Sequence, residues 1–249
     1  MKDITPNFTP ASVNCDECPI KDRAVCAYCE KSEMALLEAM KSYKTYAAGD
    51  PITFAGDRMV FVGSVVTGVA RLSQTMEDGR KQMVGLLLPS DFVGRPGRSY
   101  SAFDVEATTD VTLCRFERKP FEKLLSDIPN LRERMLEMAL DELDAAREWM
   151  LLLGRKTARE KIASLLTIIA RRQNSTATVS KNDITFDLNL TREAMSEYLG
   201  LTLETVSRQI NALKKDGVIR LEKKRHVHVK DFARLLAETG DDADGGFLA

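Results

Sequence analysis

Five cysteines are the residues of this chain best suited to chemistry. Cys15, Cys18, Cys26 and Cys29 fall within 15 residues, and Cys114 lies far downstream. An odd number of thiols in a cytosolic chain argues against a disulfide framework, because that compartment keeps thiols reduced. Clustered thiolates there bind soft metal ions or carry out redox chemistry. The spacing therefore predicts a metal centre or a redox switch near the amino terminus.

These spacings allow more than one centre. Cys15-x2-Cys18 with Cys26-x2-Cys29 suits a compact tetrahedral zinc site, which would leave Cys114 as an ordinary buried cysteine. An iron–sulfur cube instead needs four thiolates that converge from flexible backbone. A single disulfide switch would use fewer thiols than the chain provides. From the residues alone, zinc is the first expectation.

The composition is that of a folded protein without a membrane span. Of 249 residues, 44% are apolar and 29% are charged, and the net charge is −1. A uniformly basic coat for nucleic acid is thereby excluded, so any basic surface must be local. No apolar run approaches the roughly 20 residues of a membrane helix, and residues 1–15 lack the apolar core of a secretory signal. We expect a cytoplasmic protein of about two domains.

Short β-rich runs separated by turn signals extend from about Tyr43 to Phe116. They predict a sandwich or barrel of short strands, and Asp78-Gly79 predicts a hairpin. The runs expected as strands are Met59–Val66, Val69–Thr75, Gln82–Leu88, Ala102–Thr108 and Val111–Glu117. Cys114 lies in the last run, near the exit from this domain.

A long helix is predicted next, because Asn130–Leu153 contains no Gly or Pro and is rich in strong helix formers. Its apolar residues form two stripes. These are Leu131, Met135, Met138, Ala145, Trp149 and Leu152 on one side, and Leu136, Leu140, Leu143 and Met150 on the other. A helix that is apolar on two sides must be covered twice, which favours a second copy packed around a twofold axis. Burial of both stripes within one subunit is the alternative, and either stripe could face a partner. A further helix is expected over Arg155–Arg172, after Gly154, and a polar loop over Gln173–Asp183.

The carboxyl-terminal third has the layout of a helix-turn-helix. The first helix, Arg192–Leu199, begins after the cap residue Thr191 and ends at Gly200, where a positive φ is expected. Thr202 caps a second helix. Its inward residues are Val206, Ile210 and Leu213, and its outward residues are Leu203, Glu204, Ser207 and Arg208. Outward positions near the start of such a helix contact base edges in the major groove.

The side chains on this outer face suit DNA. Arg208 can bond bidentately to guanine, Glu204 can accept from cytosine, and Ser207 can contact a base or a phosphate. A simple surface ion pair between Glu204 and Arg208 is the alternative. Residues 201–230 hold eight Lys or Arg against three acids, a balance of +5, which favours DNA. The expected phosphate contacts are Lys214, Lys215, Lys223, Lys224 and Arg225.

Two short strands, Val218–Glu222 and His226–Lys230, are expected to form a wing after the second helix. His226 and His228 alternate along the second of them, and no acid or cysteine is expected beside them. We therefore interpret both histidines as wing residues and not as metal ligands.

A β-roll, a long helix and a winged helix-turn-helix in this order resemble the CRP/FNR superfamily of bacterial transcription regulators over essentially the whole chain. Tyr198–Arg208 is especially similar to the FNR branch, and within it to the FnrL/FnrN-type anaerobic regulators of α-proteobacteria. The implied fold class is α+β. The implied domains are a cysteine-rich iron–sulfur loop (1–30), a β-roll sensor domain resembling cyclic-nucleotide-binding domains (31–125), a dimerisation helix (126–153), a winged helix-turn-helix DNA-binding domain (154–240) and a flexible tail (241–249).

The resemblance implies an oxygen-responsive transcription regulator and no enzyme. Such a protein is active as a homodimer that holds a [4Fe-4S] cluster, binds a palindromic operator in double-stranded DNA with TTGAT-like half-sites, and acts with RNA polymerase. Oxygen converts the cube of FNR-type proteins to a [2Fe-2S] form and weakens dimerisation. The implied cluster ligands are Cys15, Cys18, Cys26 and Cys114, and the implied base-reading residues are Glu204, Ser207 and Arg208. Cys29 competes with Cys26 as the third ligand. A regulator of the same architecture with structural zinc or a thiol redox switch remains the alternative.

Control by a cyclic nucleotide is not expected. In the stretch Phe92–Phe103, Arg95-Pro96 stands where the family's nucleotide-binding members carry the Glu that holds the ribose, and no Arg-x-Ala segment follows.

Overall fold

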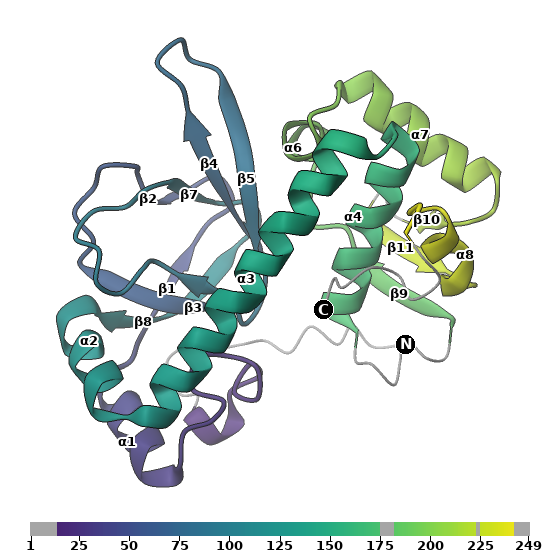
Figure 1. The fold of residues 1–249 in the computed structure, drawn as a ribbon. Helices are drawn as coiled ribbons and strands as arrows, with labels where there is room; N and C mark the ends of the chain where they lie inside the picture. The colour runs from purple at the N-terminus through teal and green to yellow at the C-terminus, as the bar shows by residue number, and fades with distance from the viewer. Residues whose placement is uncertain (1–13, 175–181, 223–224, 242–249) are drawn as a thin grey trace. The chain divides into compact units, whose positions relative to one another are not determined.

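The computed structural model describes residues 14–174, 182–222 and 225–241. The chain divides into two compact units, Met1–Met138 and Ala139–Ala249. The first contains the predicted β-domain and the second contains the helix-turn-helix (Figure 1). In the described ranges, no helix combines the length and the apolar character needed to cross a membrane.

Eight strands of the first unit form two antiparallel four-stranded sheets, with strand orders β1-β8-β3-β6 and β2-β7-β4-β5. The strands are β1 (Ser42–Tyr46), β2 (Pro51–Thr53), β3 (Phe61–Thr67), β4 (Ala70–Thr75), β5 (Lys81–Leu87), β6 (Phe92–Val93), β7 (Asp104–Ala107) and β8 (Val111–Glu117). Each strand contributes at least one buried side chain to a common core, such as Val65 of β3 and Leu113 of β8. This arrangement confirms the predicted β-roll.

The strand predictions were close, because alternation and turn residues act locally. Strand β8 has the predicted bounds, and each end of the other four predicted strands lies within two residues of its predicted position. Asp78-Gly79 forms the turn between β4 and β5, and Gly79 takes a φ of 85°. The prediction did not resolve β1, β2 and β6, which are short or carry few apolar residues.

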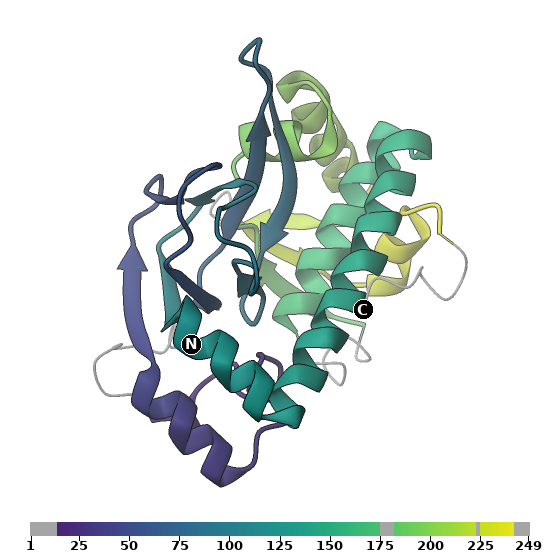
Figure 2. The same ribbon diagram turned by 60° about the vertical axis from the view of Figure 1, so that its left-hand side comes forward.

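The α-helices described beside the roll are α1 (Lys31–Met40), α2 (Arg118–Asp127) and α3 (Pro129–Arg155), of which α3 continues into the second unit. In both views α1 and α2 lie at the same end of the roll (Figures 1 and 2). Proline suits the first position of α3, because its fixed φ is helical and its missing N–H needs no partner there. Ile128 before it is extended, as a residue preceding proline prefers.

The expected break at Gly154 was wrong. Helix α3 continues through Gly154 and ends at Arg155, and the next helix, α4, spans Ala158–Gln173. Thr157 caps α4, and Glu160 bonds back to the Thr157 backbone in a capping box. The capping box fixes the start of α4 at Ala158. A single glycine destabilises α3 too little to end it at Gly154. The apolar residues predicted for the second helix are buried: Ile162, Leu165, Leu166 and Ile169.

The two stripes of α3 differ in exposure. In the first stripe, Leu131 and Leu152 are buried and Ala145 is exposed. The second stripe is exposed throughout, with relative exposures of 61% for Leu136, 53% for Leu140, 45% for Leu143 and 72% for Met150. The exposed second stripe favours coverage by a second copy, and the side of α3 that faces a partner stays a prediction.

The second unit holds the helix pair α6 (Arg192–Leu199) and α7 (Leu203–Lys215), a small sheet, and α8 (Phe232–Ala237). The sheet has three strands and not the two predicted: β10 (Arg220–Glu222), β11 (His226–Val229) and β9 (Ile184–Asp187), in the order β10-β11-β9. Strand β9 has only four residues, too few for its alternation to be clear from sequence. The expected loop over Gln173–Asp183 begins inside α4 and lies largely outside the described residues.

Candidate functional site

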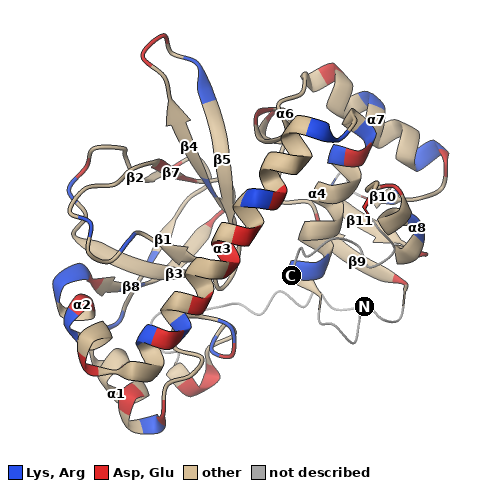
Figure 3. Ribbon diagram, in the orientation of Figure 1, with Lys and Arg blue, Asp and Glu red and all other residues tan. Residues whose placement is uncertain are grey.

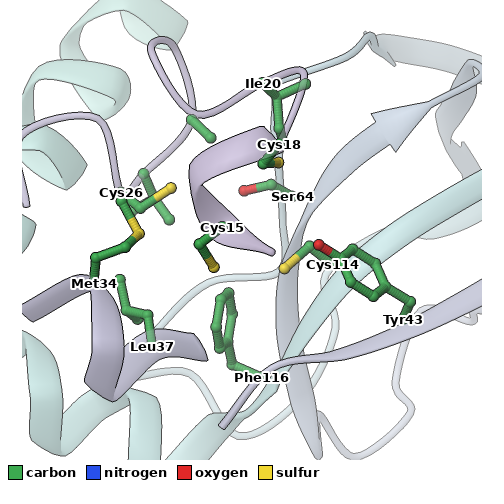
Figure 4. A pocket seen from close by; sticks show the side chains of 12 residues that line it. Cys15, Cys18, Ile20, Cys26, Met34, Leu37, Tyr43, Ser64, Cys114 and Phe116 are labelled. Carbon is green, nitrogen blue, oxygen red and sulfur yellow. The ribbon is translucent and has the colours of Figure 1, made fainter. Parts of the chain in front are cut away.

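Four thiols from two distant parts of the sequence line one apolar hollow in the first unit (Figure 4). Cys15 lies on the short 3-10 helix η2 (Cys15–Glu17), Cys18 and Cys26 lie on the turns that follow, and Cys114 lies on β8. The other lining residues are Ile20, Ala24, Val25, Met34, Leu37, Tyr43, Ser64 and Phe116. The structure thus brings together the four residues expected to bind a cluster.

The amino-terminal segment is held by its own turns and by buried side chains. The Asn14 side chain accepts a hydrogen bond from the backbone nitrogen of Asp16 at 3.1 Å and caps η2. The Lys21 ammonium donates to the backbone oxygen of Asp16 at 2.6 Å. Ile20 and Ala24 are buried in a cluster that includes Val66 of β3. An irregular segment is therefore anchored on the roll.

Alternation along β8 directs Cys114 to this segment. Leu113 points into the core of the roll, whereas Cys114 and Phe116 line the hollow on the other face, as expected for successive residues of a strand. Tyr43 of β1 and Ser64 of β3 lie opposite Cys114 on its two neighbouring strands. The sheet thereby fixes the position of the downstream thiol.

The thiols raise one another's pKa. Burial raises the pKa of Cys26 and of Cys114 to about 12, and the nearby Cys18 and Cys15 add to both shifts. Burial also raises the pKa of Cys15, and Lys41 opposes this shift because its Nζ lies 3.3 Å from the Cys15 sulfur. Thiols with such pKa values are neutral at pH 7. A cationic centre beside Cys26 and Cys114 would favour their thiolate forms, which burial disfavours.

Cys29 does not line the hollow. It packs against the core that contains Phe121, and its pKa rises to about 11 through burial and the charge of Glu33. The four amino-terminal thiols thus share no single hollow, as a compact zinc site would require. Within the described ranges, no three His, Cys, Asp or Glu side chains are grouped to hold a single metal ion. The placement favours Cys26 over Cys29, and the ligand set stays a prediction.

The cysteine segment is tied to the first turns of α3. Arg134 donates hydrogen bonds to the backbone oxygens of Arg23 at 2.6 Å and Ala24 at 3.4 Å. Arg134 also pairs with Glu137, which accepts from the Tyr28 hydroxyl at 2.8 Å. A change in the conformation of this segment therefore changes the contacts of the long helix.

Several residues around the hollow were not predicted from the sequence. Lys41, Tyr43 and Ser64 surround the thiols, and Arg134 holds their segment. For Ser64 a signal existed, because it is a hydroxyl in the otherwise apolar run 61–66. For Arg134 there was none, since its partners are backbone oxygens more than 100 residues away.

The predicted helix-turn-helix is present with its caps. The Thr191 hydroxyl accepts from the backbone nitrogen of Ala194 at 3.0 Å, and the Thr202 hydroxyl accepts from that of Thr205 at 3.2 Å. Gly200 closes α6 with a φ of 61°, a left-handed conformation that favours glycine. Each of these residues performs the role predicted for it.

The residues predicted to read DNA lie on the outer face of α7. Val206, Ile210 and Leu213 are buried. On the opposite side Leu203, Glu204 and Arg208 are exposed and Ser207 is half-buried. No ion pair joins Glu204 to Arg208, both of which lie in the described part of the chain. Both side chains are thus open to a ligand, and their role as base contacts stays a prediction.

The charges are divided as the sequence indicated. Figure 3 shows Asp and Glu positions on the ribbon in the middle of α3 and Lys and Arg positions along α7. Lys214 and Lys215 are exposed in the last turn of α7, and Arg225 is exposed before β11. Lys223 and Lys224, also expected to contact phosphate, lie outside the described residues.

The expectation that no acid lies near the two histidines was wrong. Nδ1 of His226 lies 2.9 Å from a carboxylate oxygen of Asp187, and Nε2 of His228 lies 2.7 Å from one of Asp183. Both aspartates come from β9 or the residue before it, so the unpredicted third strand brings them there. The two histidines thus connect β11 to β9. Both lie in the wing, as predicted.

The stretch Phe92–Phe103, where no nucleotide site is expected, makes a hydrogen bond to α2. The backbone nitrogen of Gly97 donates to the Glu122 carboxylate at 2.8 Å, and Arg118 pairs with the same carboxylate at 2.6 Å. The absence of cyclic-nucleotide control stays a prediction.

Two families match the two units. Residues 43–127 match the cyclic nucleotide-binding domain, and residues 160–238 match the Crp-like helix-turn-helix domain. These ranges agree with the β-roll and with the helix-turn-helix, whereas the finer domain boundaries given above stay predictions.

Similar proteins match this chain over most of its length, across both units. The chain is 66% identical to the transcriptional activator protein FnrL of Cereibacter sphaeroides, over 93% of this chain and 94% of that protein. It is 34% identical to the nitrogen fixation regulation protein FixK of Bradyrhizobium diazoefficiens, over 89% and 92% of the two chains. The structure of FixK2 from Bradyrhizobium japonicum superimposes with a TM-score of 0.72 at 29% identity, covering 81% of this chain and 98% of that one. The chain therefore belongs to the CRP/FNR family of DNA-binding transcription regulators, which are not enzymes, and within it to the FnrL type.

Proposed function

We propose that this chain is an oxygen-responsive transcriptional activator that binds a [4Fe-4S] cluster through Cys15, Cys18, Cys26 and Cys114 and binds DNA as a homodimer. The observation that carries the proposal is the hollow in which these four thiols meet. Activation is supported by a relative at 66% identity whose name is transcriptional activator protein FnrL. The target would be a palindrome with TTGAT-like half-sites, RNA polymerase would be the partner, and the protein would act in the cytoplasm without a cyclic nucleotide.

The donor set fits an iron–sulfur core. Cysteine thiolates are the usual ligands of such clusters in proteins, and soft sulfur suits iron. Glu38 accepts from the Cys15 backbone nitrogen at 3.3 Å, and Lys41 donates to the Cys15 sulfur, so α1 and the residue after it position this ligand. When bound, the cluster supplies an oxygen-sensitive redox centre.

The residues of the chain connect this site to dimerisation. A core held by all four thiols joins the amino-terminal segment to β8, and Arg134 holds the same segment to α3. Helix α3 carries the exposed stripe that a second copy would cover. Occupancy of the hollow would thus bias the ordering of α3 and, through it, the monomer–dimer equilibrium.

Dimerisation in turn determines DNA binding. A palindrome presents two half-sites related by a twofold axis, so two copies of α7 must be held together to bind both. Glu204, Ser207 and Arg208 would contact the bases, and Lys214 with Lys215 would contact phosphates.

The test is anaerobic purification with measurement of iron and acid-labile sulfide per chain. Equal amounts of both, with operator binding lost as the visible absorbance bleaches in air, would support the proposal. Operator binding that survives complete cluster loss would contradict oxygen sensing. Zinc without sulfide or colour would support the alternative of a structural zinc site.

A matched pair of variants tests the ligand set. Cys26→Ser is expected to lose iron and sulfide, whereas Cys29→Ser is expected to keep both, because only Cys26 lines the hollow. Cys114→Ser should behave like Cys26→Ser. A Cys114→Ser protein with full iron content would contradict a ligand from the roll.

A further inference from the structure

One buried hydroxyl in the hollow makes no hydrogen bond to the described part of the chain. Ser64 of β3 is 2% exposed, and its Oγ has no partner there. Ser64 lines the hollow with the four cysteines, and Figure 4 shows its hydroxyl directed into the space that the thiols surround. A buried polar group without a hydrogen-bond partner is destabilising. Because Ser64 also lines the hollow with the four thiols, its hydroxyl is placed to donate a hydrogen bond to a ligand bound there.

The strands fix where this hydroxyl can act. Ser64 pairs with Cys114 on β8 and with Phe92 on β6, so β3 is held on both sides. A β-carbon on the preceding Gly63 would lie 2.4 Å from the Cys114 carbonyl oxygen, which shows how closely β3 and β8 approach. The Ser64 side chain can rotate about its first torsion but cannot leave the hollow.

The acceptors expected in the hollow are sulfur atoms. The other lining side chains are mainly hydrocarbon, apart from the thiols and Tyr43. A hydrogen bond formed there is shielded from water and is electrostatically stronger than one at the surface. Lys41 already donates a hydrogen bond to the Cys15 sulfur at 3.3 Å. Ser64 would be a second hydrogen-bond donor to sulfur in the same hollow.

We propose that Ser64 donates a hydrogen bond to a sulfur of the iron–sulfur core or of a coordinating thiolate and thereby stabilises the electron-rich form of the core. This inference rests on the proposed function. Hydrogen bonds to the sulfurs are among the factors that set the reduction potential of such clusters. Ser64 is thus a positioning residue that slows the loss of the cluster in air.

Ser64→Ala tests this role, because it removes the hydroxyl and leaves all four thiols. The anaerobic variant is expected to contain as much iron and sulfide as the unmodified protein. Its cluster should have a lower reduction potential and bleach roughly tenfold faster in air-saturated buffer, the lower end of effects seen when groups around a metal site are removed. The Fe–S stretching bands in resonance Raman spectra should shift less on exchange into D2O, with the contribution of the Lys41 donor retained. Ser64→Thr retains a hydroxyl and should restore all three properties.

Ser73→Ala is the matched control. Ser73 on β4 is also fully buried, and its Oγ also lacks a partner among the described residues, but it does not line the hollow. It should leave the potential, the bleaching rate and the Raman bands unchanged. The inference is overturned if Ser64→Ala matches the unmodified protein, if Ser73→Ala changes the same properties equally, or if Ser64→Thr behaves like Ser64→Ala. Failure of the proposed function is distinct, because the unmodified protein would then contain no cluster.

Discussion

The guanidinium of Arg134 donates a hydrogen bond of 2.6 Å to the backbone oxygen of Arg23, and this contact joins the long helix to the cysteine segment. Arg23 lies between Cys18 and Cys26, and Arg134 lies two residues before the exposed stripe begins at Leu136. At 3.6 residues per turn, the contact and the stripe lie on different sides of the same part of α3. Helix α3 therefore both contacts the cysteine segment and carries the exposed apolar stripe.

Arg134→Gln is expected to separate cluster binding from dimerisation. The variant keeps the four thiols and should keep full iron and sulfide, but it loses charge-assisted bonds to two backbone oxygens. The dimer of the cluster-loaded protein should weaken about tenfold, or ~1.4 kcal/mol, in anaerobic analytical ultracentrifugation. Lys123→Gln removes one exposed charge from α2 and serves as the control. Equal dimer affinity for Arg134→Gln and unmodified protein would show that the contact transmits nothing.

Leu140→Glu should make the protein monomeric without unfolding it. Leu140 is 53% exposed in the single chain, so a polar residue there costs the monomer little. In a twofold dimer the two new carboxylates would face each other, and juxtaposed like charges cost about 3 kcal/mol. Size-exclusion chromatography gives the oligomeric state and circular dichroism the helix content. Ala145→Glu adds the same charge to an exposed position of the first stripe, on another side of α3, and should remain dimeric. A dimeric Leu140→Glu protein would place the interface elsewhere.

Arg208→Ala and Glu204→Ala are expected to relax sequence discrimination. Each side chain is exposed at the start of α7, where a helix in the major groove contacts base edges. The loss should be roughly 1–3 kcal/mol on the cognate operator and small on single-base variants at the contacted position. Lys214→Ala should instead weaken binding to all sequences and reduce its salt dependence. Titrations of operator variants at two salt concentrations measure both. Uniform weakening by Arg208→Ala would make it a phosphate contact.

The second unit should lose stability in acid through Glu238. A hydrogen bond from Arg159 lowers the pKa of Glu238, and the two side chains are 2.5 Å apart, each less than one third exposed. Because the folded pKa lies below its ordinary value of 4.5, the contribution is fully present above pH 4.5 and is lost as the pH falls through the lowered value. Glu238→Gln should lower the unfolding free energy by about 1 kcal/mol at pH 7 and by less in acid. Denaturant titrations at several pH values measure this, and a constant difference would contradict it.

Local features of the sequence predicted local structure well. Thr191, Gly200 and Thr202 each carry their signal in their own type and in the residues next to them, and all three act as predicted. Gly154 misled because a glycine weakens a helix by only about 1 kcal/mol, and α3 continues through it to Arg155.

Features that depend on tertiary pairing could not be predicted. Strand β9 is defined by its partner β11, and the contacts of His226 and His228 follow from that pairing. The hollow depends on the register that sets Ser64 and Tyr43 beside Cys114, and a shift of one residue would turn Cys114 into the core of the roll. Residue type and spacing identified the cysteines as candidate ligands. Which of them lie together could be learned only from the folded sheets.

The separation of the thiols along the chain determines the order in which the proposed ligands become available during synthesis. Cys15, Cys18 and Cys26 leave the ribosome before any strand of the roll, whereas Cys114 takes its place only after β8 has paired with β1 and β3. A nascent chain therefore presents only three of the four proposed ligands until the sheet has formed. In the proposed site, iron and sulfide can therefore be bound by all four thiols only on a chain whose roll has already folded, so folding of the roll would control maturation of the cofactor.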